Sequence, residues 1–342
     1  MRRLRILVLM HPDCVPPDSS HGYTAQQINV WKTEYDVVST LRGAGHDVRP
    51  LGVQEEIKPV RDEIEGFKPH VVFTLLEEFH YQTAYDQHIA SFLELMKVPY
   101  TGCNPRGLVL ARGKDLSKTL VHQRRIAVPA FAVFPMRRKI KRPPRLALPL
   151  IVKSLNEDGS HGISQASVVD TDEKLVERVA FIHERIETAA IAEQFIEGRE
   201  LYVGVLGNNR LKALPVWELK FGTTGGVRSI ATEKVKHDTS YQERLGIVDG
   251  LAKDLKPEVS DRIQRTAKRI YRTLGLDGYA RIDFRLSSDD TPYFIEANPN
   301  PEIAKSQEFA SAARHIGLAY PDLLNRIVTL GIRRAKAGAS VG

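Results

Sequence analysis

The sequence predicts an α/β fold, because short apolar segments alternate with helical segments over the first third of the chain. Residues 5–10 form an apolar run that ends at a His-Pro-Asp loop, which is typical of a buried strand in a parallel sheet. Residues 25–41 have the apolar spacing of a helix, and a strand candidate follows at 47–50. Residues 71–76 repeat the strand pattern before a helix at 86–96, so this part predicts a parallel sheet with helices.

Two further subdomains are predicted because the character of the sequence changes after residue 111. A basic helix and a proline-rich segment precede a strand at residues 148–153, and together they predict a small α+β lobe. A strand at 200–206, a helix at 257–274 and a hairpin predict a second α+β unit. We therefore expect an N-terminal α/β subdomain, a small central lobe and a C-terminal catalytic subdomain, at residues 1–111, 112–191 and 192–342.

Composition indicates a folded enzyme in a reducing compartment. With 342 residues and 42% apolar content, the chain can bury the cores of two or three subdomains, which excludes a disordered tail protein. The opening apolar run is too short for a signal sequence and no later run is long enough to span a bilayer, so we expect a cytoplasmic protein without membrane contact. Cys14 and Cys103 lack metal-ligand spacing, which argues against zinc.

The net charge of +7 suggests nucleic acid or an anionic small molecule as a partner. The densest basic cluster, residues 137–145, contains Pro143 and Pro144 and has no aromatic side chains that could stack on bases. We therefore favour a solvated loop in this segment and expect no nucleic-acid partner.

The most informative segment is a predicted antiparallel hairpin with strands at residues 279–286 and 293–298. A turn centred between residues 289 and 290 places Asp283 opposite Glu296 and Arg281 opposite Asn298. Alternation then puts four polar side chains on one face: Arg281, Asp283, Glu296 and Asn298. The other face carries four apolar side chains: Ile282, Phe284, Ile295 and Ala297.

The polar face of this hairpin offers oxygen ligands of the kind that Mg²⁺ prefers, together with substrate phosphates. Arg281 beside them could hold a phosphate or a developing oxyanion. The alternative is a surface hairpin with ordinary cross-strand salt bridges, and the hairpin alone does not decide between the two.

A second feature is the strand that ends at Lys153 and runs into a polar loop with several glycines. A lysine and the backbone N–H groups of such a loop can surround phosphate oxygens, although the sequence is not a Walker A motif. The loop's candidate phosphate contacts are Gly159, Ser160 and Gly162. Lys114 is a further candidate cation, for which a solvated helix residue is the alternative.

A third feature, residues 191–200, offers the acceptor and the apolar wall that an adenine pocket needs. Glu193 is followed by Phe195 and Ile196, and Glu200 could accept hydrogen bonds from ribose hydroxyls. By itself this segment could equally be an edge strand and a turn.

Lys114 and the three features stand in the order and approximate spacing of the ATP-grasp superfamily, and within it the chain most resembles the D-alanine–D-alanine ligase family. Residues 93–102 resemble the segment that closes the family's N-terminal domain. Lys234 lies in a glycine-rich stretch that resembles the mobile active-site loop. The resemblance spans residues 71–327.

The resemblance implies ATP as the nucleotide and two Mg²⁺ ions, with Mn²⁺ as an alternative ion. Phosphate contacts would come from Lys114, Lys153 and the glycine loop with Gly159, Ser160 and Gly162. The nucleotide pocket would be formed by Glu193, Phe195, Ile196 and Glu200. The metal ligands would be Asp283, Glu296 and Asn298. Arg281 would act at the reacting carboxyl group, and Lys234 at the transferred phosphoryl group.

The implied reaction joins a small-molecule carboxylate to an amine, each an amino acid or peptide, through an acyl phosphate. Three departures alter the substrate pockets: residues 76–85 differ from the family pattern, Glu34 is a weak match for its amine-binding glutamate, and Glu302 replaces a glycine. A true D-alanine–D-alanine ligase is therefore one alternative, and a nucleotide-binding scaffold or basic nucleic-acid-binding protein without activity is another. We expect residues 221–227 to form a lid over the active site. The sequence does not decide whether the protein forms a homodimer.

Overall fold

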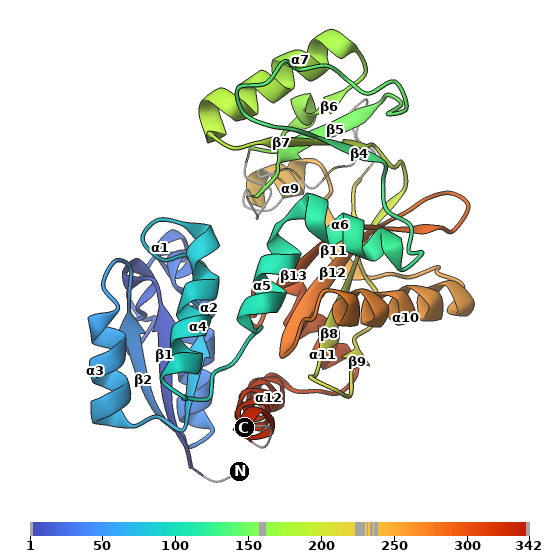
Figure 1. Ribbon diagram of the computed structural model, residues 1–342. Helices are drawn as coiled ribbons and strands as arrows, with labels where there is room; N and C mark the ends of the chain where they lie inside the picture. Colours follow the sequence, from blue (N-terminus) through green and yellow to red (C-terminus); the bar gives the residue numbers. More distant parts are fainter. Residues whose placement is uncertain are drawn as a thin grey trace.

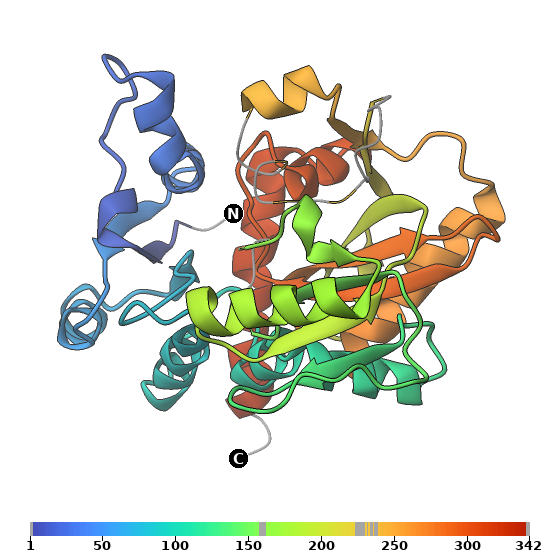
Figure 2. The same ribbon diagram turned by 90° about the horizontal axis from the view of Figure 1, so that it is seen from above.

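The structure is a computed structural model, which describes residues 3–156, 162–222, 230, 232, 235 and 239–339. The strands of these residues form three sheets. Figure 1 shows the part with the first sheet on the left, the central lobe at the top and the part with the third sheet on the right. In Figure 2 the C-terminal helices lie between the first and third parts.

The first sheet has three parallel strands in the order β2–β1–β3, in agreement with the predicted α/β pattern. Its strands are β1 (Arg5–Met10), β2 (Asp47–Gly52) and β3 (Val71–Thr74). The helices of this part are α1 (Ala25–Val30), α2 (Lys32–Gly43), α3 (Lys58–Phe67) and α4 (Asp86–Leu95). Residues 6–10 of β1 are fully buried, which explains why this strand is an unbroken apolar run.

Two boundaries predicted for this part are wrong. The helix predicted at residues 25–41 is two helices, because Trp31 leaves the helical conformation with φ −124° and ψ 19°. Thr24 begins the first of them in a capping box with Gln27. The third strand ends at Thr74 instead of residue 76, because its pairing with β1 stops there.

The central sheet is antiparallel in the order β4–β7–β5–β6. Its strands are β4 (Phe131–Phe134), β5 (Leu150–Ser154), β6 (Val168–Val169) and β7 (Ala190–Gln194). Helix α7 (Asp172–Phe181) packs Leu175 in one core with Leu150 and Val152 of β5. Because side chains alternate along a strand, Ile151 and Lys153 point to the opposite face of this sheet, toward the third sheet.

The third sheet has the order β11–β10–β8–β12–β13, with β9 paired to β8. Its strands are β8 (Arg199–Leu206), β9 (Lys212–Ala213), β10 (Trp217–Lys220), β11 (Val248–Leu251), β12 (Tyr279–Leu286) and β13 (Pro292–Pro299). The remaining named helices are α5 (Pro105–Arg112), α6 (Lys114–Gln123), α9 (Thr239–Arg244), α10 (Pro257–Thr273), α11 (Glu308–His315) and α12 (Tyr320–Ala339). Apolar residues of α5, α6 and α10 form one core with β8, β12 and β13.

The C-terminal helix α12 returns to the first sheet. Its residues Leu323 and Ile327 lie in one core with Ile6 and Val8 of β1. Helix α2 also contacts the chain that follows β13, because its Asp36 pairs with Lys305. The subdomain boundaries at residues 111 and 191 stay predictions.

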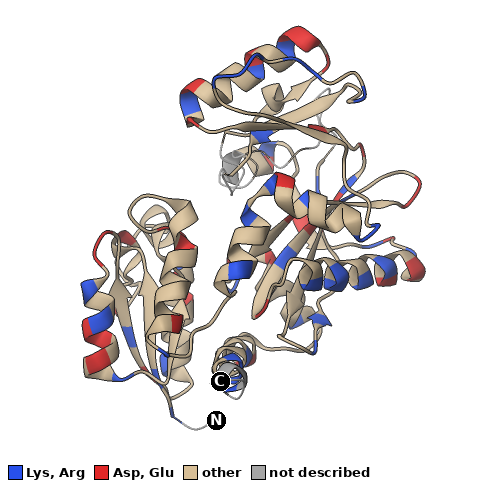
Figure 3. Ribbon diagram, in the orientation of Figure 1, with Lys and Arg blue, Asp and Glu red and all other residues tan. Residues whose placement is uncertain are grey.

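Basic residues recur along α10, where the ribbon in Figure 3 carries a row of blue segments. Exposed members of this row are Arg262, Arg265, Arg269 and Arg272. The basic cluster at 137–145 is largely exposed, with Arg142 paired to Asp172. None of the described helices combines the length and apolar character needed to cross a membrane.

Candidate active site

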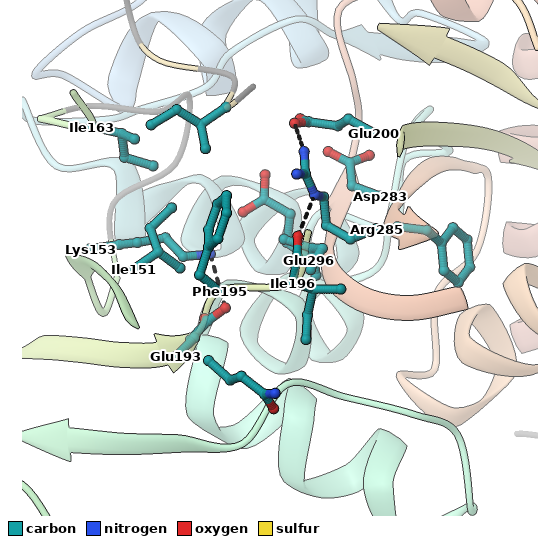
Figure 4. A pocket seen from close by; sticks show the side chains of 14 residues that line it. Ile151, Lys153, Ile163, Glu193, Phe195, Ile196, Glu200, Asp283, Arg285 and Glu296 are labelled. Carbon is teal, nitrogen blue, oxygen red and sulfur yellow. Dashed lines mark hydrogen bonds and ion pairs between the residues drawn. The ribbon is translucent and has the colours of Figure 1, made fainter. Parts of the chain in front are cut away.

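A cavity lies between the central sheet and the third sheet (Figure 4). Apolar residues that line it come from both sides: Ile151, Ile163, Phe195, Ile196, Ile230, Phe284 and Ile295. Charged side chains do so as well: Lys153, Glu193, Glu200, Asp283, Arg285 and Glu296. The structure thus brings together most of the predicted nucleotide residues and two of the predicted metal ligands.

A buried cluster of three charged groups stands on the central-lobe side of the cavity. Lys153 Nζ lies 3.1 Å from Glu193 Oε2, and Lys118 Nζ of α6 lies 3.3 Å from Glu193 Oε1. The side chain of Lys153 is 6% exposed, that of Glu193 is 1% exposed and that of Lys118 is 0% exposed. One carboxylate therefore pairs with two ammonium groups out of contact with bulk water.

Burial and charge act in opposite directions on this cluster. Burial disfavours the charged form of Lys153, but Glu193 and Glu296 outweigh it and raise the pKa of Lys153. Burial prevails at Lys118 and lowers its pKa to about 8, although Glu193 opposes the shift. Burial favours the neutral form of the Glu193 carboxyl group, but the positive charges of Lys118 and Lys153 have the larger effect and lower the pKa of Glu193. At neutral pH the cluster is therefore ionised and has one positive charge in excess.

Arg285 of β12 connects this strand to two other residues that line the cavity. Its Nε donates to the carbonyl of Ile196 at 3.1 Å, and its Nη1 donates to Glu200 Oε2 at 3.2 Å. The hydroxyl of Tyr202 donates to Glu200 Oε1 at 2.9 Å. These bonds fix Glu200 and the segment after β7 at the mouth of the cavity.

The hairpin pairs as predicted at its polar residues, with Asp283 opposite Glu296 and Arg281 opposite Asn298. Arg281 donates from Nε to Asp283 Oδ1 at 2.8 Å and from Nη2 to Asp283 Oδ2 at 2.9 Å. The amide nitrogen of Asn298 donates to Asp283 Oδ2 at 3.0 Å. Arg281 also contacts Glu308 of α11, so one guanidinium joins two carboxylates.

The polar residues of the β12–β13 hairpin have the chemistry that Mg²⁺ binding needs. Asp283, Glu296 and Asn298 provide two carboxylates and an amide oxygen, which are ligand atoms that hard cations prefer. No cage of three or more His, Cys, Asp or Glu side chains occurs in the part of the chain that the structure describes. A metal ion held here would therefore need further oxygen ligands, such as phosphate oxygens.

One predicted orientation in the hairpin is wrong. Alternation assigned Ile295 to the apolar face, but Ile295 lines the cavity. The register shifts between Asp283 and Phe284, so that Phe284 pairs with Phe294. A β-bulge of this kind adds one residue to a strand and changes the faces of the residues around it. Phe294, fully buried, takes the apolar position instead.

The other predicted residues lie elsewhere. Lys114 is buried in the first turn of α6 and is not among the residues that line the cavity. Gly162 has a left-handed φ of 69°, accepts a hydrogen bond from Arg178 and precedes the lining residue Ile163. Three predicted site residues, Gly159, Ser160 and Lys234, lie outside the described residues. Most of the predicted lid at 221–227 lies outside them as well.

Sequence reasoning missed Lys118 and Arg285. Arg285 follows Arg281 and Asp283 at the same period of two, so strand alternation could have placed it on the cavity face. Lys118 follows Lys114 by four residues and shares its helix face. That spacing does not reveal which of the two lysines reaches Glu193.

Comparisons with known proteins agree with this geometry. The family described as D-ala D-ala ligase C-terminus matches residues 120–329. A D-alanine–D-alanine ligase of Bordetella petrii is 35% identical over 247 residues, which cover 71% of each chain. The chain belongs to the D-alanine–D-alanine ligase family. The uncharacterized protein y4sG of Sinorhizobium fredii is also similar, with 28% identity over 306 residues and 87% of each chain covered.

Solved structures of the D-alanine–D-alanine ligase family share the fold. The D-alanine–D-alanine ligase of Bacillus anthracis complexed with ATP superposes with a TM-score of 0.76 at 19% identity, over 98% of this chain and 99% of that one. The VanG D-Ala:D-Ser ligase of Enterococcus faecalis gives a TM-score of 0.71 at 19% identity, over 96% of this chain and 100% of that one. The predicted three-subdomain ATP-grasp fold and the ligase class are confirmed: the chain is an ATP-dependent ligase that forms carbon–nitrogen bonds.

Proposed function

We propose that the cavity holds ATP and that the enzyme activates a carboxylate as an acyl phosphate before joining it to an amine. The observation that carries this proposal is the position of Asp283 opposite Glu296, in the cavity that Lys153 also lines. A cation site and an ammonium group on facing walls suit a triphosphate between them. Phe195 and Ile196 offer the apolar surface for the adenine.

In the proposed mechanism the protein mainly positions reactants and neutralises charge. Lys153 would bind phosphate oxygens, and Asp283, Glu296 and Asn298 would hold two magnesium ions. Magnesium supplies Lewis-acid stabilisation of the charge on the transferred phosphoryl group. Arg281 stands beside the metal ligands, where its guanidinium can stabilise the carboxylate and the later tetrahedral oxyanion.

We propose that the substrates bind where the first part of the chain meets the loop after β13. Thr33 Oγ1 of α2 donates to Glu302 Oε1 at 3.2 Å. Asp36 pairs with Lys305 Nζ at 3.4 Å and accepts from its backbone N–H at 2.9 Å. These polar contacts join the two sides of the proposed substrate site. From the ligase relatives we propose an amino acid or short peptide as substrate, in the cytoplasm where ATP is available.

Relatives that are named D-alanine–D-alanine ligases support the formation of that dipeptide as a second candidate reaction. The acidic surroundings of Arg281 and the position of Glu302 favour an altered substrate instead. Arg281 is already shared by Asp283 and Glu308, so an incoming carboxylate must compete with Glu308 for the guanidinium. The compound that triggers ADP release decides between a D-alanine–D-alanine ligase and a ligase with another substrate.

The test measures ADP release with ATP and magnesium across single amino acids, D-alanine included, and short peptides. Wild-type protein is compared with Asn298→Ala and with Asn209→Ala, which changes an exposed turn residue before β9. We expect release that depends on a compound of the panel and on Asn298 but not on Asn209. Release with D-alanine alone identifies the dipeptide ligase, and release that ignores Asn298 contradicts the proposed metal site.

A further inference from the structure

Lys118 is a fully buried lysine to which the proposed mechanism gives no role. It extends from α6 to the space between β7 and β13, with its side chain 0% exposed. Its Nζ lies 3.3 Å from Glu193 Oε1, donates to the carbonyl of Ile295 and stands 5.5 Å from the ring centroid of Phe294. Burying an ammonium group is costly unless specific partners compensate it, and these contacts are such partners.

The carbonyl of Ile295 belongs to the β-bulge. The register shift leaves Ile295 out of the residue pairs between β12 and β13. A buried carbonyl that loses its ladder partner needs a donor from elsewhere, and Lys118 supplies one. The bulge directs Ile295 into the cavity and keeps Glu296 opposite Asp283. Lys118 therefore secures a strand segment that carries both a cavity wall and a candidate metal ligand.

The carboxylate of Glu193 is the other partner, and Lys118 shares it with Lys153. One carboxylate oxygen pairs with each lysine. Two lysines against one glutamate leave one positive charge, and of these two lysines Lys153 is the one that lines the cavity. Without Lys118, Glu193 would neutralise Lys153 alone and the attraction for phosphate would fall.

We propose that Lys118 is a positioning residue for ATP, because it holds the bulge at Ile295 and takes part of the charge of Glu193 so that Lys153 can bind phosphate. Lys118 does not line the cavity and acts through these three residues. The inference rests on the nucleotide site proposed above.

The test titrates a nonhydrolysable ATP analogue with Mg²⁺ into wild-type protein, Lys118→Gln and the double variant Lys118→Gln/Glu193→Gln. Lys118→Gln keeps a side-chain donor for the carbonyl of Ile295 but removes the surplus charge, so it should raise the Kd by about tenfold. The double variant regains the surplus, because Lys153 then faces no carboxylate at position 193. Its Kd should return to within about threefold of the wild-type value. In turnover, Lys118→Gln should raise the KM for ATP and leave kcat within about threefold.

A merely structural role predicts the opposite order, since the second substitution removes another buried contact and cannot recover affinity. A double variant that binds no better than Lys118→Gln overturns the inference, as does a Lys118→Gln protein that binds like the wild type. If Lys118→Gln does not fold, Glu193→Gln is compared with the wild type: it leaves Lys153 without a carboxylate partner at position 193, so a Kd clearly above the wild-type value overturns the inference.

Two controls accompany these titrations. Lys174→Met removes an exposed lysine of α7 that pairs with Asp170, and it should leave the Kd unchanged. Wild-type protein with no affinity for the analogue contradicts the nucleotide site itself, and the inference falls with it. Wild-type binding with unchanged Kd in every variant contradicts only the role of Lys118.

Discussion

The two walls of the cavity carry opposite excess charge. On the central-lobe wall, Lys153 shares the carboxylate of Glu193 with Lys118, which is buried behind this wall. On the hairpin wall the relation is reversed, because the guanidinium of Arg281 is shared by Asp283 and another carboxylate. The first wall attracts an anion and the second a cation. Together they complement a nucleotide phosphate with its metal ion, which neither wall could bind alone.

Loss of a carboxylate on the hairpin wall should have the largest effect. Glu296→Gln removes a charge that the metal needs while it keeps the size of the side chain. We expect kcat/KM to fall by on the order of 100-fold, and the magnesium concentration for half-maximal rate to rise. Steady-state ADP release over a magnesium titration measures both. Glu258→Gln changes an exposed glutamate of α10 and should behave like the wild type. A Glu296→Gln enzyme with normal magnesium dependence contradicts the assignment of this wall.

Loss of the lysine on the opposite wall should weaken the nucleotide and not the metal. Lys153→Met leaves Glu193 paired with Lys118 and removes the ammonium that lines the cavity. The Kd of the ATP analogue should rise by about 30-fold, which is roughly 2 kcal/mol. The magnesium requirement at saturating ATP should change little. If calorimetry shows equal Kd values for the variant and the wild type, the phosphate does not contact this wall.

The central-lobe wall should also respond to pH. Burial lowers the pKa of Lys118 to about 8, and the positive charge of Lys153 acts in the same direction. The negative charges of Glu193 and Glu296 oppose this shift. Bound phosphate favours protonated Lys118, so ATP affinity is full below about pH 8 and declines above it. We expect a loss of about threefold between pH 7.5 and pH 9. Lys118→Arg keeps its charge in this range, and its Kd should stay level. A parallel decline in both proteins would assign the effect to another group.

The smallest expected effect concerns Glu34, a carboxylate outside both walls, and the dependence of protein stability on pH. Burial raises the pKa of Glu34 to about 7, and Glu77 and Glu302 add to the shift. The folded protein therefore binds a proton that the unfolded chain releases near pH 4.5, and stability falls as pH rises from about 4.5 to about 7. Glu34→Gln removes this dependence, so its gain in melting temperature should be larger at pH 8 than at pH 5. Glu56→Gln, an exposed control, should show no such difference, and an equal gain at both pH values would contradict the account.

Local pattern was sufficient to predict the frame of the site. The hairpin that carries Asp283 and Glu296 pairs in the predicted register, because two alternating runs around a short polar turn leave few other pairings. The long helix after residue 257 and the parallel sheet at the N-terminus follow from apolar spacing in the same way.

Tertiary contacts decided the features that pattern could not predict. The carbonyl of Ile295 at the bulge accepts a hydrogen bond from Lys118, which lies on a helix 177 residues earlier in the chain. That contact does not follow from the residues next to the bulge. At the helix break, the ring of Trp31 packs against Tyr23 and Tyr35, with ring centroids 5.4 Å and 5.6 Å away, and apolar spacing alone did not predict where the helix breaks.

The most direct test of opposite charge on the two walls is a crystal structure with a nonhydrolysable ATP analogue and Mn²⁺, whose anomalous scattering locates the metal. The account predicts a metal peak among the oxygens of Asp283, Glu296 and Asn298, with the phosphates between that peak and Lys153. A metal peak away from the hairpin, or a nucleotide whose phosphates do not reach Lys153, would contradict it.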